Sequence, residues 1–360
     1  MKVSHICVNF GTPLFRELFH ALGKFEIEQS VFYPRNKKNL KVKQIPEYKV
    51  DSPLVLNLLS KISFRRKRRI MQEQYDPIFR STKPDIIHAH TLFSDGSLAY
   101  HYNKTFGTPY IVAVRASDID VFIKYKPWLK DHARQILDRA NHIIFISPSL
   151  KKKFQMKFGQ RYESKSLLIS NGINNSFFTN EKARHATYHT PVRLVYVGRF
   201  LKRKNVPALI RFVESYPAGL TIAGEGGNDE MKVLKMIRKS SNVNYLGRIE
   251  DTSKLRDLYR ESDIFIMLSK RETLGLVYLE ALSQGIPVIY STGTGIDGLF
   301  KEKEVGIGLE SESNNEIEIA IQKILSDYQS ISKNCIQKAM EFNWNNISAK
   351  YYQLYIQSLL

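Results

Sequence analysis

Short apolar and β-branched runs alternate with helical patterns along this chain of 360 residues, and the alternation begins a second time after residue 190. Strand, helix and strand at this spacing predict parallel sheets covered on both faces. In the first half we expect strands at Val3–Asn9, Ile27–Tyr33, Ile86–His90, Tyr110–Val114 and Ile143–Ser147, and helices near Leu14–Leu22, Ser94–Phe106 and Leu129–Ala140.

The second half repeats the pattern after a polar stretch, 179–190, that has little apolar periodicity. Strands are expected at Leu194–Val197, Leu220–Ala223, Val243–Leu246, Ile264–Leu268 and Pro287–Ile289, and helices from Pro207, at Glu230–Lys239 and at Val277–Ser283. We therefore predict an α/β protein with two doubly wound domains, 1–178 and 191–344, a linker at 179–190 and a final helix in 345–360. Two such domains place a ligand cleft between them, outside the carboxyl ends of the strands.

Positive charge is concentrated in the first half. The chain has 54 Lys+Arg against 35 Asp+Glu, and residues 1–180 hold 30 of the basic and 14 of the acidic residues, a net charge of +16 out of +19. Such asymmetry predicts a negatively charged partner: nucleic acid, an anionic membrane or a phosphorylated substrate. No apolar run reaches the ~18–20 residues of a membrane span, and no signal peptide is recognised, so we expect a cytoplasmic protein.

A basic run in the first half is a candidate membrane contact. It consists of Arg65, Arg66, Lys67, Arg68 and Arg69, and an apolar stretch at 54–59 precedes it. This combination is typical of a helix that lies on anionic lipid, where each cation adds about 1 kcal/mol. Val121–Lys130, with three aromatic residues among its lysines, is a second candidate. The alternative is a solvated basic helix. We find no nucleic-acid-binding motif and expect no such partner.

The segment Arg271–Leu282 predicts an anion site in the second half. A strand leads into a loop that holds Gly275, and a helix follows. Backbone N–H groups from Thr273 to Leu276 would lack partners at the helix N-terminus. Glu280, a turn into the helix, could accept hydrogen bonds from a sugar diol, and Glu272 could reach a group beyond the phosphate. The alternative is that Glu272 only favours the helix N-terminus and Glu280 is solvated.

A basic loop, Val197–Asn205, also follows a strand and leads into a helix. Arg199 offers a planar fork for two phosphate oxygens, and Lys204 offers a mobile point charge. Alone, such a loop is usually solvated surface. Its spacing relative to Asn171-Gly172-Ile173, Ala223–Gly226 and Leu246–Ile249 makes the prediction of a phosphate-binding loop more specific.

Together these segments resemble the family 4 glycosyltransferases, retaining enzymes of the GT-B fold that take sugars from nucleotide donors. The resemblance covers most of the chain and is strongest from Asn171 to Pro287. It is carried by Pro84–His90, Asn171-Gly172, Gly198-Arg199 with Lys204, the pair Glu272 and Glu280, and Phe342-Asn343-Trp344 before a Tyr-rich helix. The resemblance implies two Rossmann-like domains facing each other across a cleft, with the last helix crossing back to the first domain.

The resemblance also implies residue roles. Arg199 and Lys204 would neutralise the donor diphosphate as it leaves, Glu280 would hold the ribose, and Glu272 would contact the transferred sugar. The implied donor set is completed by the amides of Thr273, Leu274, Gly275 and Leu276, by Arg248 and Ile249 at the base, and by Gly11, Asn171 and Gly198. His90 and Asp118 would face the acceptor or the cleft.

Two positions depart from the family pattern. Gly11-Thr12 stands where many members have two glycines, and Arg115 stands where many have a histidine that contacts the donor sugar. An arginine cannot act as a base near neutral pH. Arg115 could still bind a phosphate or the sugar 6-hydroxyl, and we keep it with Arg199, Lys204 and Glu272 in the expected catalytic set.

Three sequence patterns suggest a metal or a cofactor. His88 and His90 alternate on one strand, a spacing seen in metal sites, but no third ligand is evident. Asp118-Ile119-Asp120 spells a motif of metal-dependent transferases, although the resemblance requires no metal. Gly224–Gly227 lacks the order of a dinucleotide fingerprint. We expect neither a metal nor a cofactor.

The sequence thus predicts a retaining transferase that moves a hexose or N-acetylhexosamine from a UDP-sugar, or alternatively a GDP-sugar, to a lipid-linked or oligosaccharide acceptor. The basic first domain favours the inner face of the cytoplasmic membrane and the synthesis of capsule, lipopolysaccharide or cell-wall polysaccharide. One alternative is a catalytically inactive, membrane-associated partner of a glycosyltransferase. Another is a nucleotide-sugar hydrolase or epimerase of the same architecture.

Overall fold

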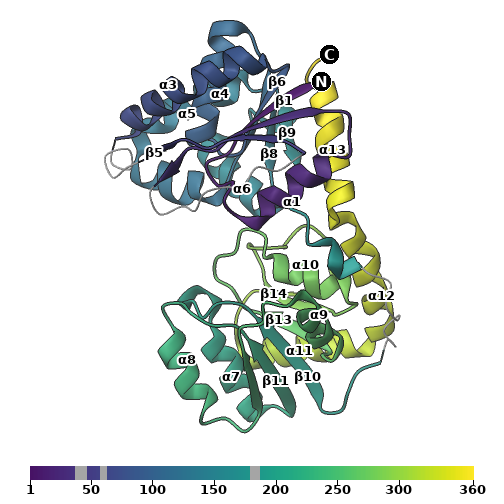
Figure 1. The fold of residues 1–360 in the computed structure, drawn as a ribbon. Coiled ribbons are helices and arrows are strands. Elements are labelled where there is room, and N and C mark those ends of the chain that lie inside the picture. Colours follow the sequence, from purple (N-terminus) through teal and green to yellow (C-terminus); the bar gives the residue numbers. More distant parts are fainter. Residues whose placement is uncertain (37–46, 57–62, 179–186) are drawn as a thin grey trace. The chain divides into compact units, whose positions relative to one another are not determined.

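The computed structural model describes residues 1–36, 47–56, 63–178 and 187–360, which form two compact units (Figure 1). Unit 1 contains Met1–Ile146, Leu150–Asn171 and Trp344–Leu360, and unit 2 contains Ser147–Ser149 and Gly172–Asn343. The chain passes into unit 2 at Gly172, whereas the sequence-based division ends the first domain at residue 178. Of the expected linker, residues 179–186 lie outside the described residues.

Unit 1 is built on a seven-stranded sheet in which every pairing is parallel. The strand order is β4-β2-β1-β6-β7-β8-β9. The bounds are β1 (Lys2–Ile6), β2 (Glu28–Phe32), β4 (Lys49–Asp51), β6 (Ile86–Ala89), β7 (Tyr110–Ala113), β8 (His142–Phe145) and β9 (Ser166–Leu168). A separate parallel pair joins β3 (Arg35–Asn36) to β5 (Leu54–Leu56).

Helices cover both faces of this sheet. Their bounds are α1 (Pro13–Leu22), α3 (Phe64–Thr82), α4 (Ser94–Phe106), α5 (Lys130–Arg139), α6 (Pro148–Phe158) and α13 (Trp344–Gln357), with short turns η1 (Asp118–Ile123), η2 (Pro127–Leu129) and η3 (Glu163–Lys165). Helices α1 and α13 pack together on one face, and α3, α4 and α5 follow one another on the other (Figure 1). Pro13 opens α1 because its fixed φ suits the first helical position.

The apolar core of unit 1 joins segments from the two ends of the chain. Phe15 and Phe19 of α1 and Tyr351 and Tyr355 of α13 are buried in the same cluster. Side chains alternate along β1, so His5 faces this cluster while Ser4 bonds to Tyr75 of α3 on the other face, with 2.6 Å between the two hydroxyl oxygens. The last helix therefore completes the core of the first unit.

Unit 2 holds a six-stranded parallel sheet with the order β12-β11-β10-β13-β14-β15. The strand bounds are β10 (Val192–Val197), β11 (Ala218–Ala223), β12 (Val243–Gly247), β13 (Ile264–Met267), β14 (Val288–Ser291) and β15 (Gly306–Leu309). Strands β11 and β12 extend the sheet on one side of β10, and β13, β14 and β15 extend it on the other. The switch in strand order therefore lies between the neighbouring strands β10 and β13. Ligands of open α/β sheets bind at such a switch point, outside the carboxyl ends of the strands.

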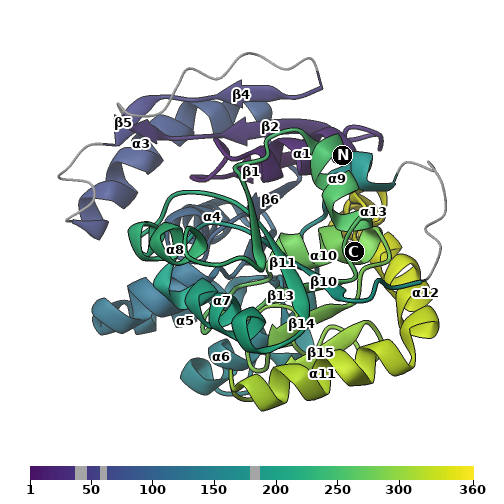
Figure 2. The ribbon, with the colours of Figure 1, turned by 90° about the horizontal axis from the view of Figure 1, so that it is seen from below.

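The helices of unit 2 are α7 (Val206–Ser215), α8 (Glu230–Ile237), α9 (Thr252–Arg260), α10 (Leu276–Ser283), α11 (Asn314–Ser326) and α12 (Tyr328–Ala339), with short turns η4 (Asn175–Phe178), η5 (Lys202–Lys204) and η6 (Met340–Phe342). Figure 2 shows α7 and α8 side by side. Helix α10 packs against α9 and α12. The two parallel, helix-covered sheets confirm the predicted α/β class with two Rossmann-like units.

Candidate functional site

The switch point of unit 2 brings two loops together. The loop after β10 holds Gly198–Asn205, and the loop after β13 holds Leu268–Gly275. Neighbouring parallel strands end at the same edge of a sheet, so these loops lie side by side. The Lys270 N–H donates to the Arg203 carbonyl oxygen at 2.8 Å, which ties one loop to the other.

Glycine backbone forms one wall of this edge. The Gly198 N–H donates to the Ala223 carbonyl oxygen at 2.9 Å, and the Gly224 N–H donates to Gly247 at 2.7 Å. Gly198 and Gly224 both have φ near 149°, and a Cβ on Gly224 would lie 2.0 Å from the Gly198 carbonyl oxygen. The close approach of these strand ends therefore requires glycine.

A pocket of about 560 Å³ opens beside these glycines. It is lined by four residues of the predicted donor set: Gly198, Arg199, Arg248 and Ile249. Glu225, which the sequence analysis did not assign, also lines it, and its Oε1 lies 3.4 Å from Nη1 of Arg248. The volume falls in the range of small-molecule sites, about 300–1,000 Å³.

A cluster of charged side chains lies where the two loops meet. Oε2 of Glu272 is 3.1 Å from Nη1 of Arg203 and 3.8 Å from Nζ of Lys204. Burial lowers the pKa of Lys204; Glu272 opposes this shift, and Arg203 and Arg199 add to it. Two cations thus contact one carboxylate, and a third, Arg199, acts on Lys204. This excess of positive charge suits a polyanionic ligand.

Arg203 is a site residue that sequence reasoning missed. It stands in a Lys-Arg-Lys run in which the family motif marks only Lys204. Its guanidinium also donates to the backbone carbonyl of Arg271. These partners lie about 70 residues away in sequence, so spacing within the loop could not have identified Arg203.

The loop before α10 differs in one respect from the expected anion site. Oε1 of Glu272 accepts a hydrogen bond from the Thr273 N–H at 3.2 Å, so this amide already has a partner and the prediction that it lacks one is wrong. Leu274 is buried, and Gly275 caps the N-terminus of the helix with φ near 78°. Leu276 is the first residue of α10. The Gly295 N–H holds the loop by donating to the Glu272 carbonyl at 3.0 Å.

Glu280 is partly buried against α9. Its Oε2 accepts a hydrogen bond from the hydroxyl of Tyr259 at 3.2 Å, and Tyr259 is fully buried. Burial raises the pKa of Glu280 to about 7, while the Tyr259 bond and Lys204 oppose the shift. The alternative that Glu280 is an ordinary solvated residue is therefore wrong.

Three residues of the predicted donor and catalytic sets belong to unit 1: Gly11, Arg115 and Asn171. Gly11 is exposed in the loop after β1, where a Cβ would lie 2.7 Å from the Tyr33 hydroxyl. Arg115 follows β7, its Nε donates to the His90 carbonyl at 3.0 Å, and its guanidinium lies over the Phe15 ring. Asn171 is the last residue of its segment in unit 1.

Asp118 and His90, expected to face the acceptor or the cleft, are buried in unit 1. The Asp118 carboxylate accepts backbone N–H groups of Arg115 at 2.8 Å and Leu92 at 3.1 Å. Burial raises the pKa of Asp118 to about 6, and these bonds oppose the shift. Asp118 thus anchors the loop after β6. Both side chains are buried, and a role of Asp118 and His90 toward the acceptor or the cleft stays a prediction.

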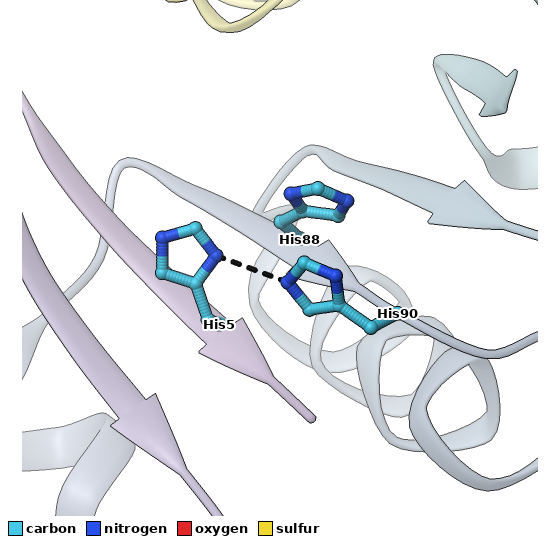
Figure 3. Close-up of side chains that lie close together, drawn as sticks. All are labelled: His5, His88 and His90. Carbon is cyan, nitrogen blue, oxygen red and sulfur yellow. Dashed lines mark hydrogen bonds between the residues drawn. The ribbon is translucent and has the colours of Figure 1, made fainter. Parts of the chain in front are cut away.

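His90 belongs to a buried group of three histidines (Figure 3). His5 on β1, His88 on β6 and His90 have ring nitrogens within 4.8 Å of one another, so His5 is the third histidine that sequence reasoning did not find. His5 Nδ1 and His90 Nε2 share a hydrogen bond of 3.2 Å, and His88 Nδ1 bonds to the Tyr355 hydroxyl at 2.8 Å.

Electrostatics does not favour a cation among these histidines. Burial lowers the pKa of His5 to about 3 and those of His88 and His90 well below the ordinary value, and Arg115 lowers the last two further. Neutral imidazole is the form that binds metals, but the nearby guanidinium repels a cation. We therefore assign the three histidines to the buried core of unit 1. That the reaction needs no metal stays a prediction.

The basic run forms the first turns of α3, and its members point in two directions. Arg65, Arg66, Arg68 and Arg69 are exposed. Lys67 is directed inward, where its Nζ donates to the Ser94 hydroxyl at 2.7 Å, and burial lowers its pKa against Asp95 and Asp118. Including Lys67 in a membrane surface is therefore wrong. Of the apolar stretch 54–59, residues 54–56 form β5, and residues 57–59 lie outside the described residues.

None of the helices in the described parts of the chain has the length and apolar character needed to cross a bilayer.

Two family models match consecutive parts of the chain. Residues 14–177 match the model described as Glycosyltransferase Family 4, and residues 177–342 match that described as Glycosyl transferases group 1. An uncharacterised glycosyltransferase of Methanocaldococcus jannaschii is 27% identical over 245 residues, and alpha-monoglucosyldiacylglycerol synthase of Acholeplasma laidlawii is 25% identical over 265 residues. The matches span 62% and 65% of this chain and the same shares of the two relatives.

Solved structures share the fold over nearly the whole chain. Sucrose-phosphate synthase from Thermosynechococcus elongatus is 20% identical with a TM-score of 0.76, covering 99% of this chain and 98% of that one. Anabaena HepE in complex with UDP is 15% identical with a TM-score of 0.72, and the match covers 99% of this chain and 100% of that one. The fold is thus GT-B, and with both family models matched in sequence the chain belongs to the family 4 glycosyltransferases.

Proposed function

We propose that this protein transfers a hexose or N-acetylhexosamine from a UDP-sugar to a lipid-linked or oligosaccharide acceptor, with retention of the anomeric configuration. The observation that carries the proposal is the pair of cations Arg203 and Lys204 at Glu272, next to a pocket of about 560 Å³ lined by Arg199 at the switch point of unit 2.

The three cations suit the leaving group of such a transfer. Departure of a nucleoside diphosphate develops negative charge on the phosphate oxygens, and fixed cations stabilise that charge without reorganising. Arg199 would bind two oxygens through its planar fork. A bound diphosphate would compete with Glu272 for Arg203 and Lys204, which frees the carboxylate of Glu272 to contact the sugar.

The remaining contacts suit a nucleoside. Arg248 and Ile249, which line the pocket, would meet the base. Glu280 would accept hydrogen bonds from the ribose hydroxyls. In the proposed retaining mechanism the departing phosphate itself takes the acceptor proton, so no protein nucleophile and no metal is required. The choice of UDP over GDP is supported by the similarity to Anabaena HepE, whose structure contains UDP.

The proposed acceptor and its cellular setting are supported by the net charge of the first half of the chain and by one relative. The first 180 residues carry a net charge of +16, and the A. laidlawii relative is named as a synthase of a glucosylated diacylglycerol. Both favour an acceptor carried on a lipid at the inner face of the cytoplasmic membrane. Synthesis of capsule, lipopolysaccharide or cell-wall polysaccharide is the setting that we propose.

Thermal-shift titration against UDP, GDP, UDP-sugars and GDP-sugars tests the donor site. A ligand at about 100 times its Kd stabilises the folded state by about 2.7 kcal/mol. We expect a shift with UDP and a UDP-sugar that disappears in the Arg199→Ala/Lys204→Ala variant. The matched control, Lys232→Ala/Lys235→Ala, removes the same charge from exposed positions of α8 and should keep the shift. No shift with any nucleotide would contradict the proposal.

A catalytically inactive partner remains the alternative because Arg115 stands at the position where a histidine is usual. Complementation of a strain that lacks the protein separates the two: Glu272→Ala abolishes the cellular function of an enzyme but leaves that of a non-catalytic partner intact. Turnover of the donor without any acceptor would instead indicate a hydrolase or epimerase.

A further inference from the structure

Two basic segments that are distant in sequence line one groove on unit 1. The groove has a volume of about 440 Å³. Its walls come from the start of α3 and from the region of η2 and α5, and include Phe64, Arg65, Arg68, Lys126, Trp128 and His132. In the sequence these segments are separate candidate membrane contacts, and the fold joins them in one groove.

Aromatic packing holds the groove in shape. The Phe64 ring packs edge-on against Phe93 and Phe122, each with 6.1 Å between ring centroids, and against His132 at 6.0 Å. Phe93 is fully buried. The start of α3 is therefore packed against the core of unit 1.

Among the described residues, no acidic side chain pairs with the cations of the groove. Within the described residues, Arg65, Arg68 and Lys126 make no ion pair, whereas Arg69 one turn further along α3 is 3.5 Å from Glu73. The Nζ of Lys126 lies 5.8 Å from the centroid of the Phe122 ring. Cations that lack an acidic partner attract an anion.

Large apolar side chains are exposed beside these cations. Trp128 is 70% exposed, Tyr125 64% and Val121 51%, all in the segment that supplies Lys126. A soluble phosphate would use the cations and leave the indole in water. A bilayer surface uses both, because aromatic side chains settle at the headgroup boundary while basic side chains reach the phosphates.

We propose that this groove binds the phosphate headgroups of an anionic lipid bilayer, with Arg65, Arg68 and Lys126 on the phosphates and Trp128 inserted at the headgroup boundary. The site deepens the proposed function, since it would hold unit 1 where a lipid-linked acceptor lies. Its test measures lipid binding and not transfer, so a failure of either proposal is seen independently of the other.

Tryptophan fluorescence gives the first test in the unaltered protein. The chain has two tryptophans, Trp128 in the groove and Trp344, which is 2% exposed in the core. Vesicles of phosphatidylcholine with phosphatidylglycerol should shift the emission to shorter wavelength, and vesicles of phosphatidylcholine alone should not. An unchanged spectrum, or an equal shift with both, would overturn the proposal.

Vesicle flotation of variants gives the second test. At about 1 kcal/mol per cation, Arg65→Ala/Arg68→Ala should bind anionic vesicles about 30-fold more weakly. Trp128→Ala should lose about tenfold. The control Lys152→Ala/Lys157→Ala removes the same charge from exposed positions of α6 and should lose less than threefold.

Two results of the flotation would overturn the site. An equal loss in the α6 control would mean that the net charge of unit 1, and not the groove, attracts the lipid. Unchanged binding of Trp128→Ala to anionic vesicles would show that the indole does not contact the lipid. Inorganic phosphate added to the titration distinguishes the source of the anion: competition at low millimolar concentration would indicate a soluble phosphate as the ligand and would also overturn the lipid assignment.

Discussion

Units 1 and 2 share one architecture and use the carboxyl edges of their sheets differently. In unit 2 the edge is open: glycine backbone, Arg199 and Arg248 line a pocket. In unit 1 the groups that follow β6 and β7 turn inward, and Asp118 and His90 are buried. A residue that follows a strand can thus be placed at the carboxyl edge of the sheet from the sequence. Whether its side chain points into a pocket or into the core depends on the segments that pack against that edge.

The two units also place positive charge differently. Unit 2 concentrates it on partly buried side chains around Glu272, where burial lowers the pKa of Lys204. Unit 1 displays it on the outside of α3, with only Lys67 of the run directed inward. Buried cations suit one bound polyanion, and exposed cations beside aromatic residues suit an extended anionic surface.

The largest effect should come from the glycine wall of unit 2. Gly224→Ala places a Cβ 2.0 Å from the Gly198 carbonyl at an unfavourable φ, and we expect a loss of about 4 kcal/mol in unfolding free energy together with loss of nucleotide binding. Gly107→Ala in unit 1 meets nothing within 4 Å and should cost about 1 kcal/mol for its φ near 73°. Urea unfolding of both variants checks this; equal costs would show that the close approach is not required.

The histidine cluster should make the stability of unit 1 depend on pH. The folded pKa of each histidine is lowered, so its contribution is complete above the unfolded value of about 6.5 and is lost as pH falls below it. Well below pH 6.5 each histidine costs at most about 1.4 kcal/mol per pH unit. Because the unfolded histidines are only partly protonated near pH 7, the three together cost about 3–4 kcal/mol between pH 7 and 5.5.

Urea unfolding followed by tryptophan fluorescence measures this dependence, because Trp128 and Trp344 both belong to unit 1. Replacing one member, His88→Leu, should reduce the slope of stability against pH by one proton even though the variant is less stable. A slope unchanged by the replacement would mean that the cluster is not neutral in the folded state.

In unit 2 the corresponding titration should appear in ligand affinity. The pKa of Glu280 is raised to about 7, and the ionised carboxylate is the form that accepts ribose hydroxyls. Affinity for UDP-glucose should therefore be about tenfold weaker at pH 6 than at pH 8. Calorimetric titration at both pH values checks this, and Glu280→Gln should bind weakly but equally at the two. An equal pH dependence in both proteins would assign the titration to another group.

The smallest expected effect concerns Arg203. Arg203→Ala removes one cation from Glu272, and we expect kcat/KM to fall about fivefold. Lys202→Ala in the same loop is exposed and should change it less than twofold. If the two variants behave alike, Arg203 belongs to the loop surface and not to the site.

The sequence by itself determined the elements that depend on local spacing. Alternation of short apolar strands with amphipathic helices fixed two parallel sheets, because period and length are properties of contiguous residues. The loop with Gly198, Arg199 and Lys204 and the pair Glu272 and Glu280 were found for the same reason: each motif lies within one strand–loop–helix segment.

Only the tertiary structure decided which partner each side chain meets. Arg203 reaches Glu272, Tyr259 bonds to Glu280, and Lys67 turns from the basic run to Ser94. His5 joins two histidines more than 80 residues away. These contacts link segments that are distant in the chain, and their directions follow from packing and burial, which no local pattern specifies.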